Sequence, residues 1–288
     1  MGSVGLHQRS GAAATLPWAY LRLPPFPQVV VRVLQLANNE KAPLHQLCDL
    51  ISSDPAFASE VLTVSNSLLY APRYSSTTIE QAVAALGENT LKGMCVTVGV
   101  RAYLGNAMSY SAMRNMWRHN LACAMVAERI AGAGSIDKDI AYTAGILHDV
   151  GRVALAVIQP KGYAALLDKH NGPAASMLLA EREMFGLDHC EAGRQLIADW
   201  KLPKSFEAVV ADHHSALRSD SAWNLAALVK VSCAIASAIG FAAFAGYTAA
   251  KYSELLGELP AQEQNLFHPD AETLTGEIAR SIHAIESF

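Results

Sequence analysis

The stretch that decides the fold is Ala144–Arg152, AGILHDVGR, in which an apolar helical run ends in a His-Asp pair. Adjacent residues on a helix point about 100° apart, so His148 and Asp149 can both face one groove between helices. Neutral imidazole and carboxylate are good ligands for Zn, Fe or Mn, which makes the pair a candidate metal site. The alternative is a solvent-exposed helix end at which Asp149 caps a turn, and the pair alone does not decide between the two.

Helical periodicity extends from this stretch in both directions. Ser53-Asp54-Pro55 is a strong helix start, Thr78 can cap the next helix, and Gly87 suits its end. The chain is therefore predicted to be all-α, since no alternating strand pattern of useful length and no internal repeat occurs. We expect the chain to turn at Gly151. The predicted helices cover about 29–37, 44–51, 55–70, 79–86, 89–104, 112–131, 136–148, 174–185, 192–200, 203–213, 225–239 and 272–285.

Bulk properties narrow the class of protein. Of the 288 residues, 51% are apolar and 17% charged, which suits one large domain or two modest ones with close helix packing. The net charge is −4 and no stretch concentrates Lys and Arg, so general nucleic-acid binding is not expected. The five cysteines lie far apart without a C-x-x-C pair, which indicates buried free thiols in a reducing cytosol.

Neither the N-terminus nor the longest uncharged run indicates a membrane protein. Residues 1–20 lack the apolar core of a signal peptide. Residues 231–250 carry no charge and are long enough to span a bilayer, but they are rich in Ala, Gly and Ser. Gly240 and Gly246 suggest breaks there, so we expect a buried helix followed by a turn and a cytoplasmic protein.

Further histidines accompany the His-Asp pair. His119 lies on a helix whose other faces are apolar, His189 lies in GLDHCEAG, and His213-His214 lie in VVADHHS. A single histidine of this kind is more often a hydrogen-bonded core or surface residue than a ligand. Their joint occurrence, each near a helix start or end, favours a common pocket.

The order of these residues resembles the HD superfamily of metal-dependent phosphohydrolases, and within it the HD-GYP branch and the related HDOD domain. The N-terminal half favours HDOD, and the resemblance covers roughly 16–238. The motifs that carry it are LPPFPQVVVRVLQLANN, LISSDPAFASEVLTVSNSLLY, TTIEQAVAALGENTLKGM, MWRHNLACAMVAERIA, AYTAGILHDVGRVAL, GLDHCEAGRQLIADWKLP and VVADHH.

The resemblance implies a multi-helix HD-like bundle with an N-terminal helical subdomain. We expect a disordered tail over 1–15, an N-terminal HDOD half over 16–110, an HD-like half over 111–240 and a C-terminal helical extension over 241–288. The candidate metal ligands that it implies are His119, His148, Asp149, His189, His213 and His214.

Three departures point to a degenerate pocket. Cys233 or a neighbour stands where the HD pattern has a late Asp, Asn115 stands where the HD-GYP branch has a Glu, and Arg152 replaces a common Lys. The GYP signature is also missing. A two-metal site needs several carboxylates to bridge the ions and offset their charge, and only Asp149 remains. The residues leave room for a single Fe, Zn or Mn ion, to which Cys233 could add a thiolate.

These departures favour a bacterial signalling or regulatory protein that is catalytically inactive and binds a partner protein or a nucleotide-type small ligand. The alternative is a working metal-dependent phosphohydrolase or phosphodiesterase, which needs bound metal and a further carboxylate. A helical scaffold without a functional pocket is the third hypothesis. A homodimer is also compatible with the sequence, and residues after Lys251 could cover the pocket, mediate dimerisation or complete the bundle.

Overall fold

A computed structural model of the chain describes residues 25–37, 43–67, 75–215, 222–244, 246–247, 250–267 and 269–287. Within these ranges the fold is all-α, as predicted, and an isolated parallel bridge pairs Asn171 with Gly246. The predicted tail over 1–15 and the end of the helix predicted to reach Tyr70 lie outside the described residues.

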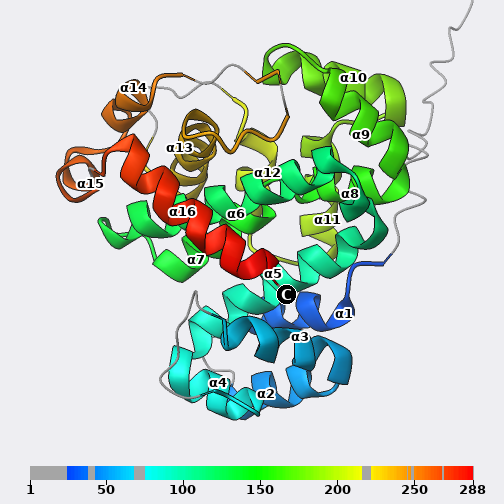
Figure 1. Cartoon of the computed structure of the whole chain (residues 1–288), viewed down its shortest axis with the longest axis vertical. Coiled ribbons are helices and arrows are strands. Elements are labelled where there is room, and N and C mark those ends of the chain that lie inside the picture. Colours follow the sequence, from blue (N-terminus) through cyan, green and yellow to red (C-terminus); the bar gives the residue numbers. More distant parts are fainter. Residues whose placement is uncertain are drawn as a thin grey trace, which may run out of the picture.

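The first four helices form the block at the base of Figure 1. They are α1 (Gln28–Ala37), α2 (Leu44–Ser52), α3 (Pro55–Ser65) and α4 (Ile79–Leu86). Their predicted caps are confirmed: the Asp54 carboxylate accepts the backbone N–H groups of Ala56 and Phe57 at 3.1 Å. The Thr78 hydroxyl accepts one N–H of α4, and Gly87, with a φ of 89°, ends that helix.

Helix α5 (Glu88–Leu104) joins this block to the larger bundle (Figure 1). Ten of its 17 residues are buried, which matches a helix covered on most sides. It packs against α1 and α3 on one side and against α7 and α8 on the other. A short 3-10 helix, η2 (Gly105–Ser109), follows it.

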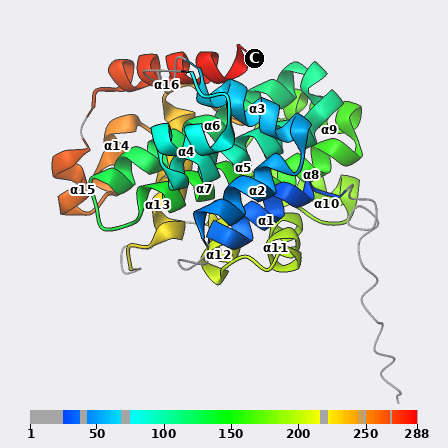
Figure 2. The same ribbon diagram turned by 90° about the horizontal axis from the view of Figure 1, so that it is seen from below.

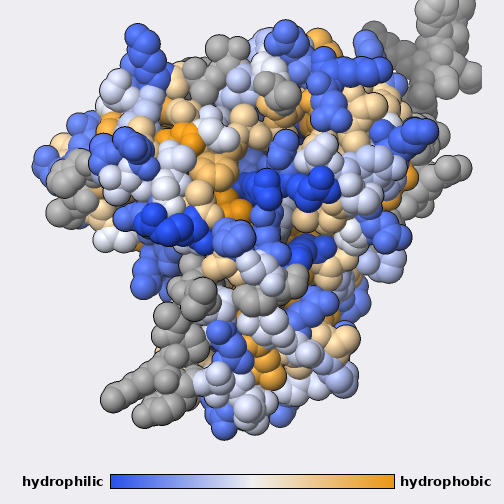
Figure 3. All heavy atoms as spheres, in the orientation of Figure 1, coloured by the Kyte–Doolittle hydropathy of each residue, from blue (hydrophilic) through white to orange (hydrophobic). Residues whose placement is uncertain are grey.

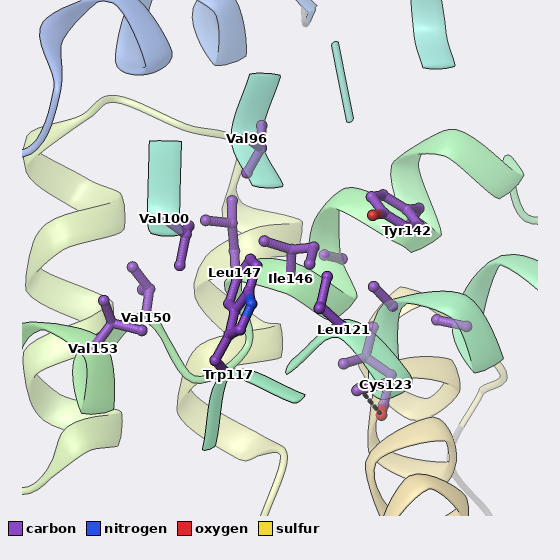
Figure 4. Packing of buried hydrophobic residues seen from close by; sticks show 14 of the residues in the cluster. Val96, Val100, Trp117, Leu121, Cys123, Tyr142, Ile146, Leu147, Val150 and Val153 are labelled. Carbon is purple, nitrogen blue, oxygen red and sulfur yellow. Dashed lines mark hydrogen bonds between the residues drawn. The ribbon is translucent and has the colours of Figure 1, made fainter. Parts of the chain in front are cut away.

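The larger bundle is built around α6, whose Trp117 side chain lies among Val100, Leu147 and Val150 (Figure 4). Small residues let helices approach closely, because a Cβ on Gly145 would lie 2.5 Å from the Cα of Ala124. The bundle comprises α6 (Ser111–Gly132), α7 (Lys138–Leu147), α8 (Val150–Ile158), α9 (Pro160–Lys169), α10 (Ala174–Phe185), α11 (His189–Asp199), α12 (Lys204–Asp212) and α13 (Leu225–Ala238).

The predicted turn at Gly151 is wrong, because this residue lies inside α8. The chain bends earlier, at His148 and Asp149, where Asp149 leaves the helical region with φ −104° and ψ 22°. Gly151 serves a different purpose: a Cβ there would lie 1.8 Å from the carbonyl oxygen of His189, so glycine permits the close approach of α8 to α11. Helices α8 and α9 were not predicted.

The C-terminal part adds α14 (Tyr252–Gly257), α15 (Ala261–Leu266) and α16 (Ala271–Glu286), of which only α16 was predicted. Helix α16 crosses the front of the bundle in Figure 1 and runs along its edge in Figure 2. Two ion pairs tie it to α6, Arg118 with Glu286 and Arg129 with Glu277. The face that it crosses is largely hydrophilic, with small hydrophobic areas (Figure 3).

One helical run, Lys138–Ile158, is long and apolar enough to cross a membrane by length and composition, but 83% of its apolar window is buried inside the protein. The uncharged run over 231–250 behaves as predicted, since α13 ends at Ala238 and Gly240 takes a positive φ of 98°. The division of the chain at residues 110 and 240 stays a prediction.

Candidate metal-binding pocket

Two buried groups of potential metal ligands lie side by side in the larger bundle. The thiol cluster is His119, His148 and Cys233, and the carboxylate cluster is Asp149, His189, His213 and His214. Within each cluster the ligand atoms lie within 4.8 Å of one another. The structure thus brings together all six candidate ligands of the sequence and Cys233.

Helix ends deliver most of these side chains to the pocket. His148 and Asp149 occupy the bend between α7 and α8, and His213-His214 follow the end of α12. His189 is the first residue of α11, whose start is fixed by a capping box between Asp188 and Glu191. The packing of α6 against α13 brings His119 to within 3.4 Å of the Cys233 sulfur.

The imidazole rings are oriented by backbone carbonyls. The Nδ1 atoms of His119, His148 and His213 lie 2.6, 2.7 and 3.1 Å from the carbonyl oxygens of Phe241, Gly145 and Val210. A carbonyl oxygen only accepts, so each Nδ1 carries the hydrogen and each Nε2 points inward. Burial lowers the pKa of His119, and it lowers the pKa of His148 to about 3, which keeps both rings neutral at pH 7.

Arg152 is fully buried and binds three groups of the pocket. Its Nε donates to Asp149 Oδ1 at 3.0 Å, its Nη1 to Glu181 Oε1 at 3.4 Å, and its Nη2 lies 3.2 Å from His214 Nε2. Burial alone would raise the pKa of Asp149, but the Arg152 charge and the surrounding histidines hold it well below its usual range. Arg152, which was predicted to neighbour the pocket, therefore contacts two members of the carboxylate cluster directly.

Glu181 is a second buried carboxylate that the sequence analysis missed. Its Oε2 lies 2.5 Å from Nδ1 of His189, and its Oε1 accepts the Tyr163 hydroxyl at 2.6 Å. Burial opposes its ionisation, yet His189 and Arg152 lower its pKa to about 2. A signal was present, because Glu181 stands between Met177 and Phe185 at four-residue spacing on the buried stripe of α10. Tyr163 lies on the unpredicted α9.

Asn115 differs from the candidate ligands in its exposure. It is exposed on α6, one turn before His119, and belongs to neither buried cluster. That it neighbours the pocket stays a prediction. The i, i+4 spacing places both side chains near one stripe of the helix, on which His119 is buried and Asn115 is exposed.

The segment after α13 closes the pocket. The Phe241 carbonyl holds His119, and the Phe244 side chain is only 4% exposed. The Phe244 ring centre lies 5.8 Å from the Arg152 guanidinium carbon and 5.2 Å from the ring centre of His170. Gly246 then pairs with Asn171, where a Cβ would lie 2.3 Å from the His170 carbonyl oxygen. Among the described residues, the Phe244 ring thus packs between Arg152 and His170.

The residues fit a single metal ion better than the two-metal centre that the HD resemblance implies. In the carboxylate cluster, Asp149 Oδ1 already faces Arg152 and His213 Nε2, at 3.0 and 3.1 Å. In the thiol cluster, His148 Nε2 is buried, and no residue in the described part of the chain forms a hydrogen bond with it. An inward nitrogen with its opposite side fixed by a carbonyl is the usual arrangement of a metal-binding histidine.

Comparisons with known proteins agree with this fold. The HDOD domain profile matches residues 23–216. An uncharacterised Treponema pallidum protein is 23% identical over 195 residues, which are 67% of this chain but only 38% of that protein. The chain thus corresponds to well under half the length of this curated relative.

Solved structures show the same architecture. An HDOD domain protein of unknown function from Geobacter sulfurreducens is 23% identical, with a TM-score of 0.68 over 92% of this chain and 91% of that chain. A Marinobacter aquaeolei protein, provisionally named for signal transduction, is 22% identical, with a TM-score of 0.65 over 93% of this chain and 58% of that one. These identities show a shared fold alone. The profile match over two thirds of the length establishes that the chain belongs to the HDOD domain family.

Proposed function

We propose that this protein is a bacterial signal-transduction regulator of the cytoplasm, whose HD-like pocket does not hydrolyse phosphate esters. The observation that carries the proposal is the buried Arg152 guanidinium, which binds both carboxylates of the pocket, Asp149 and Glu181. A two-metal hydrolase needs its carboxylates free to bridge the ions and offset their charge. Here both carboxylates already form ion pairs with Arg152, whose guanidinium stays protonated.

The closed pocket supports the same proposal. His119, His148, Asp149 and His189 are each at most 2% exposed, and Phe244 lies against Arg152. Phosphoryl transfer requires the ester, the attacking water and the metal in one accessible site. The signal is then transmitted by contact with a partner protein or by a nucleotide-type ligand that binds elsewhere on the fold.

The test is a hydrolysis assay on the full chain with bis(p-nitrophenyl) phosphate, nucleotides and cyclic dinucleotides, each with added Mn²⁺, Fe²⁺ or Zn²⁺. We expect no turnover above that of the His148→Ala/Asp149→Ala variant, which has lost the HD pair. Metal-dependent turnover that this variant lacks would refute the proposal and establish the phosphohydrolase alternative.

A thermal-shift series with the same nucleotides separates the two modes of signalling. A ligand that binds only the native state raises the apparent stability by about 2.7 kcal/mol at a hundred times its Kd. A saturable shift supports a nucleotide-type ligand, whereas no shift across the series favours a protein partner.

A further inference from the structure

The thiol cluster differs from the carboxylate cluster in how its donor atoms are used. In the carboxylate cluster, Arg152 contacts Asp149 Oδ1 and His214 Nε2. In the thiol cluster, the Nε2 of His148 has no hydrogen-bond partner among the described residues, although His148 is 1% exposed. An unpaired buried polar atom is costly, and a bound ion is one way to satisfy it.

The distances in the thiol cluster suit tetrahedral coordination. With Zn–N bonds of about 2.1 Å and Zn–S bonds of about 2.3 Å, an N and an S ligand of one tetrahedral ion lie roughly 3.6 Å apart. The Cys233 sulfur and His119 Nε2 lie 3.4 Å apart. His148 Nε2 and Asp149 Oδ2 are 3.6 Å apart, where an N and an O ligand are expected at about 3.4 Å. Asp149 Oδ2 thus lies beside His148, but the donor atoms that all fall within 4.8 Å of one another in this cluster are those of His119, His148 and Cys233.

Charge balance decides how many ions the pocket accepts. When no ion is bound, the charged side chains of the pocket that form ion pairs with one another are Arg152, Asp149 and Glu181, and their net charge is −1. One divalent ion and Arg152 carry three positive charges, which equal the three negative charges of Asp149, Glu181 and a Cys233 thiolate. A second divalent ion would add two positive charges without partners in a dry interior, which is strongly unfavourable.

From these observations we propose that the pocket holds a single borderline-soft divalent ion of the Zn²⁺ class, bound by His119, His148 and the Cys233 thiolate, with Arg152 as the fixed cation in place of a second metal. Thiolate and imidazole ligands favour such an ion over Mn²⁺ or Mg²⁺. An ion held by these three side chains would join α6, the α7–α8 bend and α13. This inference rests on the proposed function and deepens it, because it names the ion that the non-hydrolytic pocket binds.

The test is a titration of chelator-treated full-length protein with Co²⁺, followed by absorption spectroscopy. Co²⁺ reports its own ligands: a thiolate gives a charge-transfer band in the near ultraviolet, and tetrahedral geometry gives intense visible bands. We expect both signals in the wild type, saturating at one equivalent, and their displacement by one equivalent of Zn²⁺. Absence of the charge-transfer band in the wild type, or saturation at two equivalents, would overturn the proposal without any variant being needed.

Three variants locate the ligand. Cys233→Ser should lose the charge-transfer band, whereas Cys95→Ser, which alters a fully buried thiol of α5, should keep it. Cys233→Asp should bind Co²⁺ without that band and should bind Mn²⁺ better relative to Zn²⁺, because a carboxylate replaces the thiolate. A band that persists in Cys233→Ser refutes the assignment of the sulfur ligand.

The outcomes for the ion and for the proposed function are distinguishable. If the protein shows neither the cobalt signals nor turnover, the proposal of a bound ion is refuted, and the proposal of a signalling role holds. If the protein shows the cobalt signals and also metal-dependent turnover, the proposal that the pocket does not hydrolyse phosphate esters is refuted, and the proposal of a bound ion holds.

Discussion

Replacing Arg152 with Met tests how the pocket is held together. Met keeps much of the apolar volume but removes the only guanidinium in contact with Asp149 and Glu181 among the described residues. Removing one partner of a buried ion pair costs about 3–5 kcal/mol, since the charge that remains is buried without compensation. Unfolding entropy is about 2.1 cal/mol/K per residue, or about 0.6 kcal/mol/K for 288 residues. The melting temperature should therefore fall by about 5–8 °C.

The matched control is Arg182→Met, which removes an arginine that also binds two acids. Arg182 contacts Asp188 at 2.6 Å and Glu191 at 3.4 Å, but its side chain is 47% exposed. Asp188 is buried but keeps the hydrogen bond from the Glu191 backbone N–H, and the Arg182 guanidinium is screened by water, so the melting temperature of Arg182→Met should fall by less than that of Arg152→Met.

Differential scanning calorimetry at pH 7 measures both variants in the same buffer. Arg152→Lys should fall between wild type and Arg152→Met, because lysine keeps the charge but lacks the planar fork. In the double variant Arg152→Met/Glu181→Gln, the fall in melting temperature should be smaller than the sum for the two single variants. The reason is that Glu181→Gln removes one of the charges that Arg152→Met leaves uncompensated. Equal losses for Arg152→Met and Arg182→Met would refute the view that the arginine stabilises the pocket.

Three further outcomes are expected. Gly151→Ala should destabilise by about 3 kcal/mol or more in denaturant titrations, because its Cβ would meet backbone at 1.8 Å, whereas Gly132→Ala, with nothing within 4 Å, should be neutral or slightly stabilising. The folded-state pKa of Glu181, about 2, lies below its ordinary 4.5, so its stabilisation is complete above about pH 4.5 and is lost toward pH 2. Wild type and Glu181→Gln should thus differ most at neutral pH and converge in acid; a difference independent of pH contradicts this. Phe244→Ala should open the pocket and speed the native-state alkylation of Cys233, followed by peptide mass spectrometry, and unchanged labelling would show that Phe244 does not close it.

Local signals predicted most of the fold. The caps at Asp54 and Thr78 and the stop at Gly87 depend on neighbouring residues alone, and the structure confirms them. The turn expected at Gly151 fails for the opposite reason. Glycine serves there as a contact point between α8 and α11, which are far apart in the chain until they fold, and no local pattern distinguishes that use from a turn.

The candidate site could be predicted where the residue type itself indicates a metal ligand. It could not be predicted where tertiary packing determines which side chains are buried in the pocket. The histidines and Asp149 could be named because their order resembles a known pattern, and all six lie together. The exposure of Asn115 could not be predicted, because it depends on what covers α6. Glu181 was missed because its role follows from an ion pair with Arg152 across 29 residues, although its place in an apolar stripe gave a hint.

The closure of the pocket by residues after α13 bears on where this protein can be cut. The HDOD match stops at residue 216, but Cys233 and the carbonyl that orients His119 come later in the chain. A fragment that ends at the family boundary would expose the apolar face that α6 presents to α13 and would leave two buried histidines facing water. The part of the chain that completes the core is thus longer than the profile match, because it includes α13 and the segment that follows it.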